Sequence, residues 1–216
     1  MLLPPRHRWH YPAVGITRQQ FEQMQERLGS VSRRATSPAF TPASTPAPGA
    51  TGVILGVDPS LRGTGFGVIQ LAKPHPATLA HGTISCPASW ERSRCLVKIF
   101  RILSEVIEKH RPTVCAIEGL FYAQNLQTAL IMGEARGAAL AAIAGAGLEI
   151  FEIAPRRVKQ AIVGHGAAQK SAVAKMVQRL LHLPEPPAPD AADALALALA
   201  HAQENSRYRL APLKKI

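Results

Sequence analysis

Three short β-type segments, followed by helical segments that alternate with further β-type segments, leave few folds open to this chain of 216 residues. Branched apolar residues mark the strands, and apolar residues at helical spacing mark the helices. The expected strands cover 53–58, 66–72, 79–86, 113–120 and 148–155, and the expected helices cover 90–110, 124–145, 156–162, 169–182 and 190–204. Hairpins that precede αβ alternation predict an α/β fold, with a mixed five-stranded sheet flanked by helices on both faces.

Glycines and prolines mark the expected turns. Gly63, Gly65 and Gly67 predict a tight turn between the first two strands. Pro112 is expected to end the helix before it, since proline cannot continue a helix. The segment 184–189 is rich in proline and predicts a turn before the last helix.

The first 50 residues differ in composition from the rest of the chain. They contain seven prolines, and the segment 35–52 has the Pro, Ala, Thr and Ser content of a disordered or extended linker. One helix is expected there, over 17–29. We therefore expect residues 1–50 to be a basic, Pro-rich, largely disordered extension, 51–205 to be one folded domain, and 206–216 to be a basic C-terminal tail.

The chain is strongly basic. Lys and Arg number 25 against 14 acidic residues, which gives a formal net charge of +11. The first 50 residues contain six Arg and two Glu, so they carry +4, and residues 51–216 carry the other +7. This balance favours a polyanionic partner, with nucleic acid first and an acidic membrane surface second. The alternative is a soluble basic protein whose charge serves no specific partner.

Cysteine usage and hydropathy predict a cytoplasmic protein. Cys86, Cys95 and Cys115 are odd in number and form no C-x-x-C pair, which argues against a disulfide framework and against a structural zinc site. Basic residues interrupt the apolar N-terminal run, so a signal peptide is not expected. The longest apolar stretch, 194–200, is far too short to span a bilayer, so no membrane-spanning segment is expected. With nucleic acid as the first candidate, no membrane is counted among the expected partners.

Two of the expected strands end in a carboxylate. Asp58 follows the apolar run that starts at Val53, and Glu118 follows the run that starts at Val114. In an open α/β sheet, ligands bind at the carboxyl ends of the strands, so both acids would reach one crevice if the strands were neighbours. The alternative is that each strand simply runs out into solvent, where acids are common.

A second pair of acids, Asp190 and Asp193, begins the last helix. Residues three apart lie on the same helix face, so the two carboxylates would project together. Helix capping is a strong alternative, since Asp is a good N-cap and an acid three residues later completes a capping box. The rest of this helix is rich in alanine, however, and small side chains would let it approach a sheet closely. Its first turn would then point into the crevice.

Four carboxylates at one place would repel one another unless hard cations lay between them. Mg²⁺ prefers carboxylate and water oxygens, and two ions about 3.5–4 Å apart are the usual arrangement for phosphodiester hydrolysis. One ion would activate the attacking water, and the other would stabilise the leaving 3′ oxygen. The four acids therefore predict a nuclease site for two Mg²⁺ ions, with Mn²⁺ as a substitute.

Five separated blocks of sequence resemble one known family in their order and spacing. They are ILGVDPSLRGTGFGVI, AIEGLFYAQN, GEARGAALAAI, PRRVKQAIVGHGAAQKSAV and DAADALALALAH, within residues 53–203. They resemble the crossover junction endodeoxyribonucleases of the RuvC family, the bacterial Holliday junction resolvases with a ribonuclease H-like fold. The resemblance implies a magnesium-dependent homodimer that makes paired, symmetric cuts in a four-way DNA junction during recombination and repair. It also implies the branch-migration proteins RuvA and RuvB as partners.

The resemblance implies roles for individual residues as well. The family's metal-binding catalytic acids match Asp58, Glu118, Asp190 and Asp193. The aromatic residue that stacks on unpaired bases matches Phe121, and two basic residues that face DNA phosphate match Lys159 and Lys170. A core position for Phe121 and a solvated surface position for each lysine stay open.

A basic run at one expected helix start supports a DNA contact independently of the resemblance. Arg156, Arg157 and Lys159 lie where the helix dipole is already positive. A phosphate bound there would relieve the repulsion, so these residues are expected to bind DNA together with Lys170.

The chain departs from the family in two places. Family members commonly read Asp-Pro-Gly after the first strand, whereas this chain has Asp58-Pro59-Ser60, from which we expect a local difference only. The first 50 residues have no counterpart in the family pattern.

Several alternatives stay open at this point. Another ribonuclease H-like nuclease, acting on RNA or of the YqgF type, would share the fold. A protein that binds junctions without cutting them would use the acids only as helix caps, and an ATP-binding domain of the sugar kinase and heat-shock fold would share the glycine-rich opening. The helix expected over 124–145 is a dimer face or packs against its own sheet, and both options are kept.

Overall fold

The computed structural model describes residues 52–119, 125–206 and 213–216. In chain order its elements are β1 (Val53–Asp58), β2 (Gly63–Gln70), β3 (Ala77–Ser85), α2 (Arg92–His110), β4 (Val114–Glu118), α3 (Leu126–Gly145), β5 (Glu149–Ile153), α4 (Pro155–Val163), α5 (Lys170–Leu180), α6 (Pro189–Ser206) and β6 (Lys214–Lys215). Every strand and helix expected after residue 52 is present, with ends shifted by a few residues. The extension predicted over 1–50 lies outside the described residues.

The sheet is mixed and open, with strand order β3-β2-β1-β4-β5-β6. The first three strands form antiparallel hairpins, and β1, β4 and β5 run parallel to one another. A parallel neighbour requires a crossover, and α2 and α3 supply the two crossovers. The α/β class and the mixed sheet expected from the sequence are confirmed.

The sheet has six strands, and the prediction of five was wrong by the short strand β6. Lys214 and Lys215 pair antiparallel with Glu152 and Phe151 of β5. The amide of Ile216 continues this ladder by donating to Ile150 O at 3.0 Å. A two-residue strand without apolar residues has no periodic signal, so no pattern in the sequence predicts it. Part of the predicted C-terminal tail therefore belongs to the sheet.

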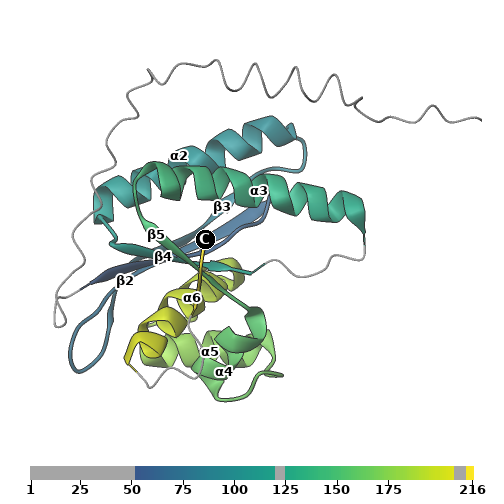
Figure 1. Ribbon diagram of the computed structural model, residues 1–216. Coiled ribbons are helices and arrows are strands. Elements are labelled where there is room, and N and C mark those ends of the chain that lie inside the picture. The colour runs from purple at the N-terminus through teal and green to yellow at the C-terminus, as the bar shows by residue number, and fades with distance from the viewer. Residues whose placement is uncertain (1–51, 120–124, 207–212) are drawn as a thin grey trace, which may run out of the picture. The chain divides into compact units, whose positions relative to one another are not determined.

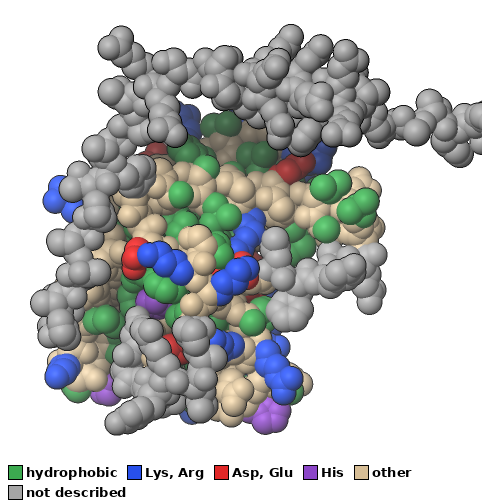
Figure 2. All heavy atoms as spheres, viewed as in Figure 1, with side chains coloured by type: hydrophobic (Ala, Val, Ile, Leu, Met, Phe, Trp, Pro, Cys, Tyr) green, Lys and Arg blue, Asp and Glu red, His purple; other side chains and the backbone are tan. Residues whose placement is uncertain are grey.

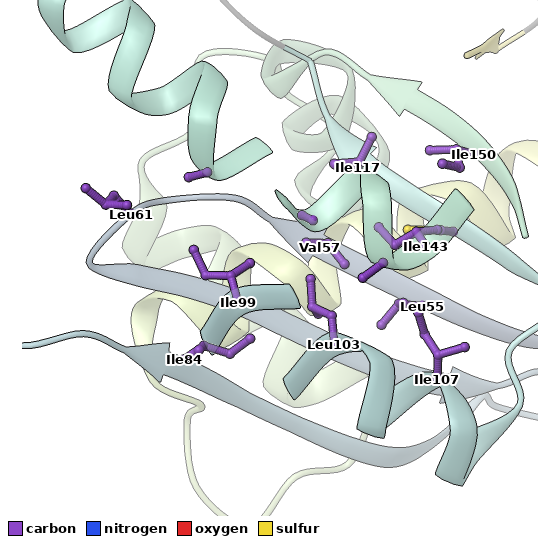
Figure 3. Close-up of a cluster of buried hydrophobic side chains, with 14 of the residues drawn as sticks. Leu55, Val57, Leu61, Ile84, Ile99, Leu103, Ile107, Ile117, Ile143 and Ile150 are labelled. Carbon is purple, nitrogen blue, oxygen red and sulfur yellow. The ribbon is translucent and has the colours of Figure 1, made fainter. Parts of the chain in front are cut away.

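Helices cover both faces of the sheet, as Figure 1 shows, with α2 and α3 on one face and α4, α5 and α6 on the other. Alternate residues of β1 divide between the two layers: Leu55 and Val57 pack toward α2 and α3, and Ile54 packs toward the other three helices. Figure 3 shows the first of these layers, where Leu103 of α2 and Ile143 of α3 meet the sheet. In the described part of the chain, no helix is long and apolar enough to cross a membrane.

The glycines expected to form a turn lie inside a strand instead. Gly63, Gly65 and Gly67 are alternate residues of β2, so all three face the same side of the sheet. Gly56 of β1 pairs directly with Gly67. Glycine interrupts chains more often than it lines a strand, so this spacing predicts a turn. In the structure, a closely packed helix requires the glycines instead.

Candidate active site

Asp58 and Glu118 lie side by side at one end of the sheet. Strands β1 and β4 are parallel neighbours, and Val57 pairs with Ile117 directly before the two acids. Both acids share the strand face of Gly56 and Ala116, which is the face covered by α6. The predicted meeting of two strand-end carboxylates is therefore present in the structure.

The glycines of β1 and β2 form the surface against which α6 packs, called the glycine surface below. A Cβ atom on Gly56 would lie 1.9 Å from the carbonyl oxygen of Ala194, and one on Gly65 would lie 2.0 Å from the carbonyl oxygen of Asp190. A Cβ on Gly67 would lie 2.7 Å from a methyl carbon of Leu195. No side chain fits at these positions, so the helix backbone rests almost directly on the strand backbones.

This close approach sets the place of the acids on α6. The Asp190 carboxylate lies over the start of β2, where a Cβ on Gly63 would be 2.7 Å from its Oδ2. The neighbouring Gly65 pairs with Asp58 across the hairpin. The first turn of α6 is thus held at the end of the sheet that carries Asp58 and Glu118. All four predicted acids converge on this end, and each is half-buried.

Burial and mutual repulsion shift the two strand-end acids in the same direction. Burial, and then the charge of Asp58, raises the pKa of Glu118 to about 8. Burial is also the largest cause that raises the pKa of Asp58, followed by the charge of Asp193. The two side chains are hydrogen-bonded to each other, with Glu118 as the protonated donor that fits the raised pKa. Two carboxyl groups this close retain one proton between them.

The helix acid Asp193 has a basic partner. Lys170 Nζ at the start of α5 lies 2.6 Å from Asp193 Oδ2. This hydrogen bond is the largest cause that raises the pKa of Lys170. The lysine side chain is 78% exposed, so it reaches the acids from the solvent side and remains accessible to another anion.

The donor set fits a hard divalent cation. In the described part of the chain, no three His, Cys, Asp or Glu side chains already surround one point as metal ligands. In this structure Glu118 is paired with Asp58, and Asp193 accepts a hydrogen bond from Lys170. Asp58, Glu118, Asp190 and Asp193 offer carboxylate oxygens only, which is the chemistry that Mg²⁺ prefers.

The RuvC family model, that of the crossover junction endodeoxyribonucleases, matches residues 54–201 of this chain. The chain belongs to this family. It is 46% identical over 148 residues to RuvC of Akkermansia muciniphila, which covers 68% of this chain and 89% of that protein. It is 47% identical over 160 residues to RuvC of Halorhodospira halophila, which covers 74% of this chain and 93% of that protein.

Solved structures agree with the RuvC assignment. A structure of T. thermophilus RuvC in complex with Holliday junction substrate matches with a TM-score of 0.70 at 33% identity, over 76% of this chain and 99% of that chain. A second T. thermophilus RuvC structure matches with a TM-score of 0.66 at 32% identity, over the same shares of the two chains. The expected family and its ribonuclease H-like fold are therefore confirmed.

The residues predicted to bind DNA in this RuvC-family chain differ in their exposure and in their ion pairs. Arg156 is exposed on α4, and Lys159 one turn later is half-buried. Arg157 forms an ion pair with Glu204 of α6, so it also joins two helices. Phe121 lies outside the described residues. Lys170 is the member of the set that contacts the acids directly.

The first turn of α4 is suited to an anion. Its N-cap, Ala154, has no side chain that can accept a bond from the first amides, and Pro155 occupies the first turn. No acid lies in that turn either. Figure 2 shows Lys and Arg side chains spread over the face in view, several of them beside Asp or Glu.

Sequence reasoning missed Arg136 of α3. Its guanidinium donates to the backbone carbonyl of Glu118 and to Oε2 of Glu152 at 2.6 Å. The available signal was a single Arg inside an Ala- and Gly-rich helical run, GEARGAALAA. A cation among small residues indicates either a solvent-facing position or a buried partner, and the sequence alone does not separate the two.

Proposed function

We propose that this RuvC-family endonuclease resolves four-way DNA junctions by metal-assisted hydrolysis, with Asp58, Glu118, Asp190 and Asp193 as the ligands of two Mg²⁺ ions. The observation that supports the proposal most strongly is the close packing of α6 on the glycine surface of β1 and β2. It brings the helix acids to the end of the sheet where the strand acids lie, although the two pairs are more than 70 residues apart in sequence. Helix capping alone does not require that approach.

The four acids are proposed to bind, orient and charge-balance the reacting groups. When bound, two such ions supply a polarised water for attack and stabilise charge on the leaving 3′ oxygen. Glu118 must lose its proton to serve as a ligand, and Asp193 must exchange Lys170 for a cation. Lys170 is then free to pair with a DNA phosphate, so its release and the binding of substrate support each other.

Basic residues of α4 and α5 are proposed to hold the DNA backbone. Arg156 and Lys170 lie in the first turns of α4 and α5, where helix dipoles favour phosphate, and Lys159 lies one turn further along α4. Arg157 is proposed to contact DNA as well, in exchange for its bond to Glu204. Phe121 is proposed to stack on bases, because it matches the stacking aromatic of the family and aromatic side chains are platforms for unpaired bases.

A homodimer is proposed on the symmetry of the substrate. A four-way junction has two-fold symmetry, and two copies of one site across a two-fold axis would cut opposite strands as a pair. The described helices offer exposed apolar side chains for it, since Leu126 and Leu130 of α3 are 75% and 58% exposed and Val97 of α2 is 55% exposed. RuvA and RuvB are the proposed partners in the cytoplasm.

A three-substrate comparison tests the proposed function. Cleavage of a four-way junction, a linear duplex of the same sequence and an RNA–DNA hybrid is measured with Mg²⁺ and with chelator. We expect Mg²⁺-dependent, paired cuts in the junction and little cutting of the other two. Faster cutting of the hybrid would favour a nuclease acting on RNA instead. Binding without cutting in any metal would favour a structural junction-binding protein.

A further inference from the structure

Arg136 is a charged residue in an apolar layer. Among residues 52–119, 125–206 and 213–216 it is the only Arg or Lys that is buried, with 6% of its surface exposed. Its neighbours on the same face of α3 are Ala135, Ala139 and Ile143, which are fully buried in the core with α2. A guanidinium removed from water requires partners for its donors, because an unpaired buried charge is very costly.

The partners of Arg136 connect three strands. Nη1 donates to the backbone carbonyl of Glu118 at the end of β4, and Nη2 donates to Oε2 of Glu152 in β5 at 2.6 Å. The other oxygen of Glu152 accepts from Lys214 Nζ of β6 at 3.1 Å. A planar guanidinium makes such a fork with fixed geometry, which a lysine ammonium does not reproduce.

One of these hydrogen bonds holds the backbone of Glu118, a proposed metal ligand. Glu118 directs its side chain toward Asp58 on the α6 face, whereas Arg136 reaches its backbone from α3 on the opposite face. The next amide, that of Gly119, donates to Ile153 O at 2.9 Å. The end of β4 is therefore fixed from two sides, just before the chain leaves the sheet.

We propose that Arg136 is a positioning residue for Glu118, and that Glu152 and Lys214 hold its guanidinium in place. The inference rests on the proposed function, in which Glu118 binds the cations. Buried ion pairs contribute little net stability, since desolvation offsets most of their attraction. What this one supplies is a fixed backbone, so that the Glu118 carboxylate does not have to be ordered when a cation binds.

If Arg136 positions Glu118, the metal affinity of the site depends on Arg136. Residues that orient a metal ligand typically change metal affinity or activity by about 10–100-fold when they are replaced. Because Arg136 is buried, it is not proposed to contact DNA, and junction binding in the absence of metal should not depend on it. A purely structural role would lower thermal stability and leave the metal dependence unchanged.

Four variants of the full chain test this. Arg136→Lys keeps the charge but not the paired hydrogen bonds of the guanidinium, and Arg136→Gln keeps neither. Glu152→Gln weakens the ion pair that holds the Arg136 guanidinium. Arg92→Gln is the matched control, since Arg92 of α2 forms an exposed ion pair at 3.2 Å with Glu134, which lies in α3 like Arg136. For each, the Mn²⁺ and Mg²⁺ concentrations for half-maximal thermal stabilisation and for half-maximal junction cleavage are measured. Junction affinity is measured in chelator.

We expect both Arg136 variants to need about 10–100-fold more metal for half-maximal stabilisation and cleavage. Glu152→Gln should shift both in the same direction by less, and Arg92→Gln should match the unmodified chain. Saturating metal should restore cleavage in the folded variants, and junction affinity in chelator should stay unchanged. If Arg136→Gln does not fold, Arg136→Lys and Glu152→Gln decide.

Unchanged half-maximal metal concentrations in Arg136→Lys and Glu152→Gln would overturn the inference. Glu118→Gln separates this failure from that of the proposed function. If Glu118→Gln abolishes cleavage while the Arg136 variants keep their metal dependence, the positioning role fails and the metal site stands. If Glu118→Gln cleaves normally, the proposed site and the positioning role both fail.

Discussion

Glu118 and Asp58 hold one proton between them at the end of the sheet, and that proton competes with any cation. Burial and the neighbouring carboxylate raise the pKa of Glu118 to about 8, from an ordinary value of 4.5. Since the folded protein keeps a proton that the unfolded chain loses at lower pH, this group favours folding less as pH rises through about 8. A bound cation reverses this, because it stabilises the deprotonated form.

At this scale we predict a specific pH dependence of metal binding. The concentration of Mg²⁺ needed for half-maximal thermal stabilisation should fall as pH rises from about 6 to about 9, because the Glu118 carboxylate becomes available. Without metal, the melting temperature should fall as pH rises from about 5 to about 8, the interval between the ordinary and the raised pKa of Glu118. Thermal melts across pH, with and without Mg²⁺, measure both. Glu118→Gln should flatten the metal response, and a metal affinity independent of pH in the unmodified chain would contradict the shared proton.

Helix α6 is the element on which the site depends, because its backbone lies directly on glycines of β1 and β2. A Cβ on Gly65 would lie 2.0 Å from the carbonyl oxygen of Asp190. Ala194, Ala198 and their small neighbours face the sheet with no exposed surface. Small residues on both partners therefore decide how far Asp190 and Asp193 reach toward the strand acids.

We predict that Gly65→Ala displaces the first turn of α6. Overpacking of this kind typically costs about 1–3 kcal/mol, and here it should also reduce junction cleavage in Mg²⁺. The matched control is Gly133→Ala in α3, where a Cβ meets nothing within 4 Å. That control should be neutral or stabilise by about 0.5–1 kcal/mol, since alanine is the better helix former. Chemical denaturation and a cleavage assay measure the two effects, and a fully stable, fully active Gly65→Ala would mean that the helix does not rest on this glycine.

The elements were predictable from sequence to the extent that they carry periodic apolar patterns. The strands that end in Asp58 and Glu118 and the alanine-rich last helix all do, so the candidate site could be assembled in outline. The role of Gly63, Gly65 and Gly67 could not, because a glycine spacing looks the same in a turn and under a close helix. Arg136 and β6 also escaped, since a buried fork and a two-residue strand depend on residues that are distant in sequence.

The whole molecule is a basic endonuclease of the RuvC family with an N-terminal extension that the family match does not include. Residues 51–216 carry +7 without the extension, so the domain that bears the acids is basic in its own right. The domain organisation proposed here is a folded nuclease domain over 51–205 with an auxiliary basic segment before it. In that organisation the extension contributes to DNA affinity and takes no part in the chemistry.

We predict that removal of residues 1–50 leaves the rate of junction cleavage at saturating protein unchanged and weakens junction binding modestly. The salt dependence of binding should become shallower, because each phosphate contact contributes about 0.9 to the slope of log affinity against log salt. Fluorescence titrations at several salt concentrations measure this. A full-length chain with the six Arg of the extension changed to Gln is the matched control. Equal slopes for the intact and shortened chains would show that the extension does not touch DNA.

The central claim is that acids from the sheet and acids from α6 form one metal-dependent site, and single-turnover cleavage of a four-way junction by Asp58→Asn and Asp193→Asn tests it most directly. The cleavage rate of each variant with Mg²⁺ should fall by more than about 100-fold. Replacing a residue that only orients a metal ligand already lowers metal affinity or activity by about 10–100-fold. Junction binding in chelator should be kept or strengthened, because a negative charge facing phosphate is removed. Near-normal cleavage by either variant would contradict the claim that the two pairs act together.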